Sequence, residues 1–298
     1  MVETIVALAA MPVVGEVAKR LLDGVCFGVK RFVEPYLAAH AEKVEARAEL
    51  EAFRGSPLRQ LEFAQEFMKN AGGRFPSEAV KELENLWKVI NAAVSCTGDA
   101  AAVEGGYPYS VAEDREWFSR FFDEARYVSD EELQVVWGRL LSERVSRPKG
   151  VNNRVLYFLR DMEKEEIETV SRALRAFLDD AFAPKSIVEQ FEGMSHDLVS
   201  LMDLDVVTPQ VSEFTPLVWT CTFEEGNVIH GHGADFRVAP LNETKELEMQ
   251  CLSLSPEGRV MSRLCTTPLS REEKKVMCKI LNNYWEGAAT VEIVEEGD

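Results

Sequence analysis

The sequence predicts a mainly α fold, in which a multi-helix bundle with long N-terminal helices precedes a small α+β, winged-helix-like C-terminal module. Apolar residues recur at helical spacing over residues 14–36, helix start signals are dense over 110–178, and alternating apolar residues follow from 217. With 298 residues, 46% of them hydrophobic, the chain is long enough to bury a substantial core in two or three modules.

Charge is distributed unevenly along the chain. The formal net charge is -18 at pH 7, yet residues 1–55 carry seven Lys/Arg against eight Asp/Glu. Affinity for nucleic acid comes from clustered Lys and Arg, so this composition argues against nucleic acid as a partner. We expect a near-neutral N-terminal module attached to a strongly acidic body.

Residues 1–55 are predicted to form a long amphipathic helical arm. Apolar residues from Val14 to Tyr36 follow steps of three and four, and Pro12 and Pro35 are expected to break or kink the helix. If continuous, residues 13–54 would reach roughly 60 Å at about 1.5 Å per residue. So long an arm predicts a partner chain, and we expect a homo-oligomer.

Two interpretations of residues 1–33 stay open. The apolar tip and the Gly24-x-x-x-Gly28 spacing suit a membrane-active or oligomerising segment. An amphipathic helix docked on the chain's own core gives the same pattern. Residues 4–15 are uncharged but too few for a membrane span, which needs about 20. The membrane or oligomer contacts of the first interpretation are Ile5, Val6, Leu8, Val13, Val14, Val17, Leu21, Gly24, Val25, Gly28, Val29 and Phe32.

Helix start and stop signals divide the middle of the chain into separate helices. Residues 56–104 are predicted as a helical hairpin that starts at Ser56-Pro57. Residues 110–180 are predicted as a central helical domain, with capping boxes at Ser110-x-x-Glu113 and Ser129-x-x-Glu132 and further helices from about Asn152 and Lys164.

Three motifs in this domain resemble a known family. Residues 117–125 read W-F-x-R-F-F-x-x-A, residues 128–148 read V-S-D-E-E-L-Q-x-x-W-G-R-L-L-x-x-x-V-x-x-P, and R-x-L-x-x-L follows at 154. These three motifs resemble a bacterial domain-of-unknown-function family that is similar to abortive-infection alpha-type phage-defence proteins. The resemblance implies a bacterial defence context and carries no catalytic residues. Ser142-Glu143-Arg144 and the loop after it depart from the family pattern.

Residues 185–298 are predicted as the winged-helix-like α+β module with a C-terminal helix. Alternation over 217–223 and 228–232, joined by Glu224-Glu225-Gly226-Asn227, predicts a β-hairpin. Cys221, His230 and His232 would share one face of that hairpin and are weak zinc candidates, although packing explains a strand histidine equally well. We expect no metal, no cofactor and no catalytic residue.

The cysteines and one basic cluster complete the candidates. None of the six cysteines has C-x-x-C spacing, so they are expected to be free thiols in a reducing cytosol. Five cations lie around the end of the second central helix. They are expected either to stabilise that helix C-terminus through the helix dipole or to bind an anion or an acidic partner. These cations are Arg139, Arg144, Arg147, Lys149 and Arg154.

Three hypotheses about function follow. The first is a non-enzymatic anti-phage effector of the abortive-infection type, which senses an infection product such as a phage protein, oligomerises and acts on inner-membrane lipid, as a pore-forming protein would, through its N-terminal helices. It would be cytoplasmic and recruited to the inner membrane on activation. The second is a soluble acidic regulatory or scaffold protein that binds a partner protein. The third is a zinc-dependent enzyme built on the predicted hairpin.

Overall fold

The chain folds into two compact units, residues 1–161 and 162–298. The structure is a computed structural model. It describes residues 16–39, 44–55, 57–69, 76–97, 114–148, 150–191, 193–208, 218–222, 228–241, 246–264 and 267–294. The fold is mainly helical with an α+β C-terminal unit, which confirms the predicted class. The division after residue 161 falls inside the segment predicted as the central domain.

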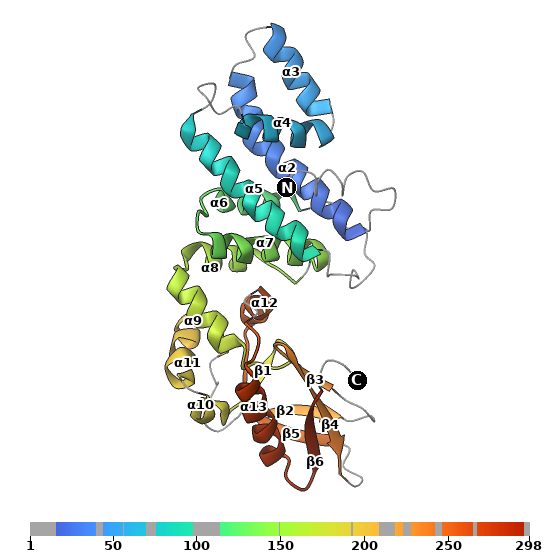
Figure 1. Cartoon of the computed structure of the whole chain (residues 1–298), viewed down its shortest axis with the longest axis vertical. Helices are drawn as coiled ribbons and strands as arrows, with labels where there is room; N and C mark the ends of the chain where they lie inside the picture. The colour runs from blue at the N-terminus through green and yellow to red at the C-terminus, as the bar shows by residue number, and fades with distance from the viewer. Residues whose placement is uncertain are drawn as a thin grey trace. The chain divides into compact units, whose positions relative to one another are not determined.

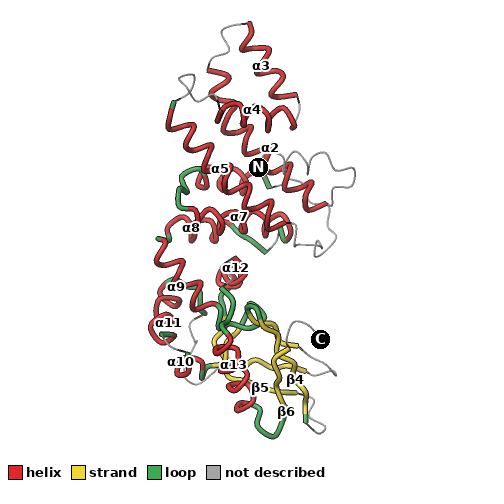
Figure 2. Tube along the Cα trace, in the orientation of Figure 1, coloured by secondary structure: helices red, strands yellow, loops and turns green. Residues whose placement is uncertain are grey.

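Unit 1 is a helical bundle (Figure 1). Its described helices are α2 (Glu16–Ala39), α3 (Val44–Gly55), α4 (Pro57–Lys69), α5 (Ser77–Thr97), α6 (Arg115–Ala125), α7 (Glu131–Ser146) and α8 (Asn153–Asp161). Helix α2 contacts each of the helices from α3 to α7, so it is a central element of the bundle. Figure 2 shows that the described strands belong to the other unit.

The N-terminal segment is two packed helices in this structure. Helix α3 contacts both α2 and α4, and its residues Leu50 and Phe53 are buried. Helix α2 continues through Pro35 to Ala39, so of the predicted break or kink at this proline the break is wrong. The helix tolerates Pro35 because the residue is exposed and lies one turn from the helix end, where few intrahelical bonds remain to be lost.

Helices α5 and α7 are in close contact at Gly138. A Cβ at this position would lie 2.5 Å from Ala92 Cβ and 2.8 Å from the backbone oxygen of Val89. Trp137 beside it is fully buried and contacts Phe121, with ring centroids 5.5 Å apart. The absence of a side chain at Gly138 therefore sets the spacing of the two helices.

The helix start signals of the central segment are shifted by one residue from the prediction in one case. Helix α7 is capped by Asp130, whose side chain accepts hydrogen bonds from the backbone N–H groups of Glu132 and Leu133. The predicted cap was Ser129. The carboxylate at Asp130 is the stronger acceptor and lies directly before the first helical residue, so it takes this role. The predicted box at 110–113 lies outside the described residues.

Unit 2 combines helices with two small antiparallel sheets (Figure 2). Its helices are α9 (Lys164–Leu174), α10 (Ile187–Gln190), α11 (Met194–Asp203), α12 (Pro256–Leu264) and α13 (Arg271–Tyr284). Its strands are β1 (Phe182–Pro184), β2 (Val218–Thr222), β3 (Val228–Gly231), β4 (Ala234–Pro240), β5 (Glu246–Ser253) and β6 (Ala289–Val294). The strand orders are β1-β5-β2 and β3-β4-β6.

The predicted hairpin between residues 217–223 and 228–232 is wrong. Strand β2 pairs with β5, where Cys221 lies opposite Leu247, whereas β3 pairs with β4, where His230 lies opposite Asp235. Both strands find antiparallel partners later in the chain, and alternation alone does not specify which strand pairs with which. The tight connection in this region is Gly231–Ala234, where Gly233 has a φ of +69°.

The contact at Gly138 generates a test of the α5–α7 packing. We expect Gly138→Ala to lower the free energy of unfolding by about 1 kcal/mol or more, because overpacking against backbone outweighs the helix propensity gained from alanine. Urea unfolding of the purified chain measures this change. Gly55→Ala is the matched control, since a Cβ there has no neighbour within 4 Å among the described residues. Equal midpoints for the two variants would contradict the packing described here.

Candidate functional site

The apolar face of α2 lies against the helices of its own unit. Among the residues predicted to contact membrane or another copy, Val17, Leu21, Val25, Val29 and Phe32 are all buried. Ile5, Val6, Leu8, Val13 and Val14 lie outside the described residues. In the described part of the chain, no helix combines the length and the apolar character needed to cross a bilayer. The docked-helix interpretation therefore describes the part of this face that the structure shows.

The predicted close helix approach at Gly24 and Gly28 occurs within the chain. A Cβ at Gly24 would lie 2.6 Å from the ring of Phe118, and one at Gly28 would lie 2.5 Å from the ring of Phe122. Both phenylalanines belong to α6 and are buried. The two glycines therefore form a groove on α2 that receives the aromatic face of α6.

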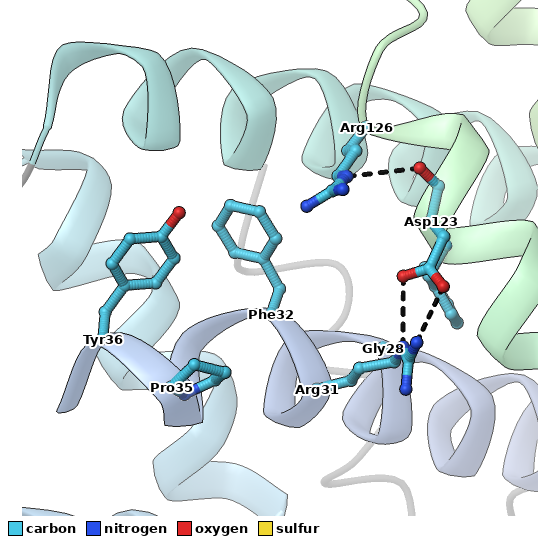
Figure 3. A pocket seen from close by; sticks show the side chains of 8 residues that line it. Gly28, Arg31, Phe32, Pro35, Tyr36, Asp123 and Arg126 are labelled. Carbon is cyan, nitrogen blue, oxygen red and sulfur yellow. Dashed lines mark hydrogen bonds and ion pairs between the residues drawn. The ribbon is translucent and has the colours of Figure 1, made fainter. Parts of the chain in front are cut away.

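A pocket of about 370 Å³ lies where α2 and α6 meet, and Figure 3 shows its side chains. More than two turns of α2, together with the C-terminal end of α6 and its C-cap, supply the lining. The residues that line it are Gly28, Arg31, Phe32, Pro35, Tyr36, Phe122, Asp123 and Arg126. Phe32 and Phe122 are buried, whereas the charged members are partly exposed, so the pocket has an apolar base and a polar rim.

Hydrogen bonds hold the polar rim in place. Arg31 donates to both carboxylate oxygens of Asp123, from Nε at 3.1 Å and from Nη2 at 2.7 Å. Arg126 donates from Nε to the carbonyl of Asp123 at 3.2 Å and forms an ion pair with Glu82 at 3.4 Å. Figure 3 shows Arg126 and Tyr36 on either side of the Phe32 ring. The bidentate pair joins α2 to α6 beside the pocket.

Tyr36 carries the phenol of the rim. Its ring contacts Phe32 and Phe67, with centroids 5.6 Å and 6.0 Å away. Burial raises the pKa of the Tyr36 phenol, the negative charge of Glu82 raises it further, and Arg126 opposes the shift. Tyr36 therefore stays a neutral donor at physiological pH.

The basic cluster predicted at the end of α7 is largely structural. Arg144 donates to Asp114 and to the carbonyls of Pro148 and Val151, and its guanidinium lies 5.2 Å from the centroid of Trp117. Arg147 pairs with Glu143 at 3.2 Å. Lys149 lies outside the described residues, Arg139 is half-buried on α7, and Arg154 is exposed on α8. Arg144 thus binds the loop after α7 to the start of α6.

The structure places the three zinc candidates on separate elements. Cys221 is on β2, and its side chain lies outside the described residues. His230 is exposed and contacts Asp235 through Nδ1 at 3.0 Å, whereas His232 is buried and contacts Ser262 through Nε2 at 3.0 Å. The described residues contain no group of three or more side chains placed to hold a metal ion.

The buried residues His232 and Ser262 form a polar network in unit 2 with Asp180, whose side chain is 35% exposed. The Ser262 hydroxyl donates to Asp180 Oδ1 at 2.8 Å, so its single proton is directed away from the imidazole. His232 Nε2 must then carry its own proton and donate to Ser262 Oγ. An imidazole that donates to the serine does not act as its base, and Ser262 is fully buried. The network therefore connects α12 to the loops at 180 and 232.

Comparison with known proteins adds a family match and no activity. Residues 70–210 match the model of a family described as "Protein of unknown function (DUF2806)", which includes the motif region at 113–177. No match was found among curated proteins or among solved structures. The pocket combines residues inside the matched segment, on α6, with residues outside it, on α2.

Sequence analysis did not identify the pocket. Arg31 and Asp123 are 92 positions apart, and each has a normal place on the polar side of an amphipathic helix. A signal was present in Pro35, a proline inside a helical pattern, close to two aromatic residues, Phe32 and Tyr36. Without the α2–α6 contact, nothing in the sequence pairs that signal with the end of α6.

The buried imidazole generates a prediction about pH. Burial lowers the pKa of His232 from its ordinary value of 6.5, and Asp180 opposes this shift. The unfolded chain takes up a proton below about pH 6.5 that the folded chain does not, so stability falls as the pH drops below this value. We expect His232→Gln, which retains a donor for Ser262, to lose less stability than the original chain between pH 7.5 and 5.5.

Urea unfolding at the two pH values measures this difference, which is at most about 1.4 kcal/mol because only one pH unit separates the ordinary pKa of 6.5 from pH 5.5. Burial raises the pKa of Asp179, which affects stability at lower pH, so the comparison stays above pH 5.5. His196→Gln is the control, because His196 is exposed. Parallel pH dependence of the chain and of His232→Gln would refute the buried neutral imidazole.

Proposed function

We propose that this chain is a non-enzymatic recognition protein, and that the α2–α6 pocket receives an aromatic side chain from a basic partner protein. The observation that carries the proposal is a pocket with an apolar aromatic base and two arginines at its rim. This function belongs to the regulatory or scaffold class predicted from the sequence.

The size of the pocket supports a single anchoring side chain. Pockets for small molecules and cofactors span roughly 300–1,000 Å³, and about 370 Å³ is at the lower end of that range. Protein interfaces commonly place one buried aromatic side chain in a pocket of this kind, with a polar rim that excludes water around it.

The chemistry of the rim suits an aromatic ring with a polar hydrogen. The Arg31 and Arg126 guanidiniums are planar cations of the kind that stack on aromatic faces, and Arg126 already lies 4.6 Å from the centroid of the Tyr127 ring. Pro35 has no N–H, so the carbonyl of Arg31 lacks its usual intrahelical donor. This carbonyl and the Tyr36 hydroxyl are acceptors for an indole N–H or a phenol O–H, which favours Trp or Tyr as the anchor.

The charge of the whole chain selects the partner. A net charge of -18 attracts basic surfaces and repels acidic ones over several ångströms, which accelerates association with a basic protein at low salt. The rim itself is close to neutral, because Arg31 and Arg126 are paired with Asp123 and Glu82. Steering by the acidic body and anchoring in the pocket are thus separate contributions.

A photo-crosslinking residue at Pro35 tests the pocket in native cells, with Val199 in unit 2, which is 58% exposed, as the control position. We expect one basic protein to crosslink from position 35 and not from 199. With that partner purified, Tyr36→Ala and Arg126→Ala should each weaken binding by about 10- to 100-fold, the effect of removing an interface anchor contact.

Arg59→Ala is the matched control, because Arg59 lies on α4 with a side chain that is 69% exposed. Circular dichroism and urea unfolding establish that each variant is folded. Failure of position 35 to crosslink a basic protein, or equal binding by the pocket variants and Arg59→Ala, would overturn the proposal.

The resemblance of residues 113–177 motivates a wider role, which we also propose: anti-phage defence of the abortive-infection type. The recognised partner would be a phage protein, assembly would follow, and the least acidic segment, residues 1–33, would act at the inner membrane. Since the described face of α2 is buried, this membrane step depends on residues 1–15 or on release of α2.

Phage plating on bacteria that express the chain tests this role. We expect fewer plaques than with an empty vector, and loss of membrane potential after infection. Val6→Asp combined with Val14→Asp should abolish both effects, because charge opposes insertion into lipid. Val199→Asp is the control at an exposed position. Protection retained by the folded double variant would refute membrane action, and no protection by the unaltered chain across a phage panel would refute the defence role.

A further inference from the structure

Unit 2 contains a second pocket, of about 540 Å³, that the partner-binding proposal does not use. It is formed by the β3–β4 turn, the end of β6 and the first turns of α13. Its charged lining residues are Asp235, Arg271, Lys274 and Lys275. Its apolar lining includes Leu269, Ile293 and Val294.

Two of the cations have no partner among the described residues. Arg271 and Lys274 form no ion pair or side-chain hydrogen bond with any residue that the structure describes, whereas Lys275 pairs with Glu272 at 3.0 Å. Asp235 Oδ1 is hydrogen-bonded to His230 Nδ1 at 3.0 Å. In a chain with a net charge of -18, the pocket therefore presents an excess of positive charge.

The position of these cations is unfavourable for the helix that carries them. Arg271 is the first residue of α13 and Lys274 the fourth, and cations near a helix N-terminus oppose the helix dipole. They also repel each other at this spacing. The two carboxylates of the first turn are already paired. Glu272 pairs with Lys275 at 3.0 Å, and Glu273 accepts from Ser270 N–H at 2.9 Å and pairs with Arg175 at 2.6 Å. A bound anion removes both penalties.

The β3–β4 turn supplies another part of the pocket wall. Gly231 and Gly233 line it, and Gly233 has a φ of +69°, which disfavours any other residue. Ala234 and Asp235 of the same turn also line the pocket, so this wall carries one small and one acidic side chain. The apolar wall of Leu269, Ile293 and Val294 offers contact for an organic group beyond the anion.

We infer that this pocket binds a small organic phosphate. The phosphate lies at Arg271 and Lys274, where its double negative charge is satisfied by two otherwise uncompensated cations. The organic group lies against the apolar wall. A volume of about 540 Å³ exceeds what a bare oxyanion needs and is within the range of small-molecule sites.

Isothermal titration with phenyl phosphate, inorganic phosphate and phenol tests the inference on the full chain at low ionic strength. We expect phenyl phosphate to bind more tightly than inorganic phosphate, and phenol not to bind. Arg271→Gln combined with Lys274→Gln should reduce the affinity for phenyl phosphate at least tenfold. Lys279→Gln is the control, because Lys279 is exposed on the same helix and does not line the pocket.

Two further titrations, one with a variant of the other pocket and one with an acidic peptide, separate this site from the alternatives. Tyr36→Ala, in the other pocket, should leave phenyl phosphate binding unchanged, so failure of the partner proposal and failure of this one are distinguishable. An acidic peptide of six glutamates that binds more tightly than phenyl phosphate would overturn the small-molecule assignment. Equal affinities of the unaltered chain, the double glutamine variant and Lys279→Gln, or no binding of either phosphate, would overturn the site.

Discussion

The packing of α2 against α6 is the contact on which the pocket and the Arg31–Asp123 pair of unit 1 depend. Gly24 and Gly28 allow the rings of Phe118 and Phe122 to approach the backbone of α2, where any side chain would force them apart. That approach covers part of the apolar face of α2, which α3, α4, α5 and α7 also contact, and brings Arg31 within hydrogen-bond distance of Asp123. The pocket is a consequence of the same contact, because its lining comes from the two helices where they meet.

The energy of this burial limits what α2 can do. Five buried apolar side chains on one face contribute on the order of 10 kcal/mol, as an upper estimate from transfer free energies. That figure is comparable to the whole stability of a typical domain, about 5–15 kcal/mol. Releasing α2 toward a membrane would also expose the surfaces of α4 to α7 that it covers. A trigger for such release must therefore provide binding energy of similar size, or the membrane step must use residues that precede α2.

The cations of this acidic chain occur in two different arrangements at helix ends. At the end of α7, Arg144 and Arg147 are in favourable positions for the helix dipole and are paired with Asp114 and Glu143. At the start of α13, Arg271 and Lys274 oppose the dipole and have no described partner. The first arrangement is accounted for by folding alone, because each of these cations has a carboxylate partner within the chain. The second has a cost in the folded chain that a bound anion offsets.

The sequence by itself determined the helical class, most helix positions, and the change to an α+β C-terminal unit, because helix periodicity, caps and strand alternation are local patterns. It did not determine which strand pairs with which, so Cys221 and His230 were placed on one hairpin although β2 and β3 belong to different sheets. It also identified the apolar stripe of α2 but not the surface that covers it. Packing on the chain's own helices, insertion into lipid and contact with another copy all require the same stripe. Only the tertiary structure decided that Gly28 meets Phe122 and that Arg31 meets Asp123, because these contacts join residues some 90 positions apart that carry no mark of each other in the local sequence.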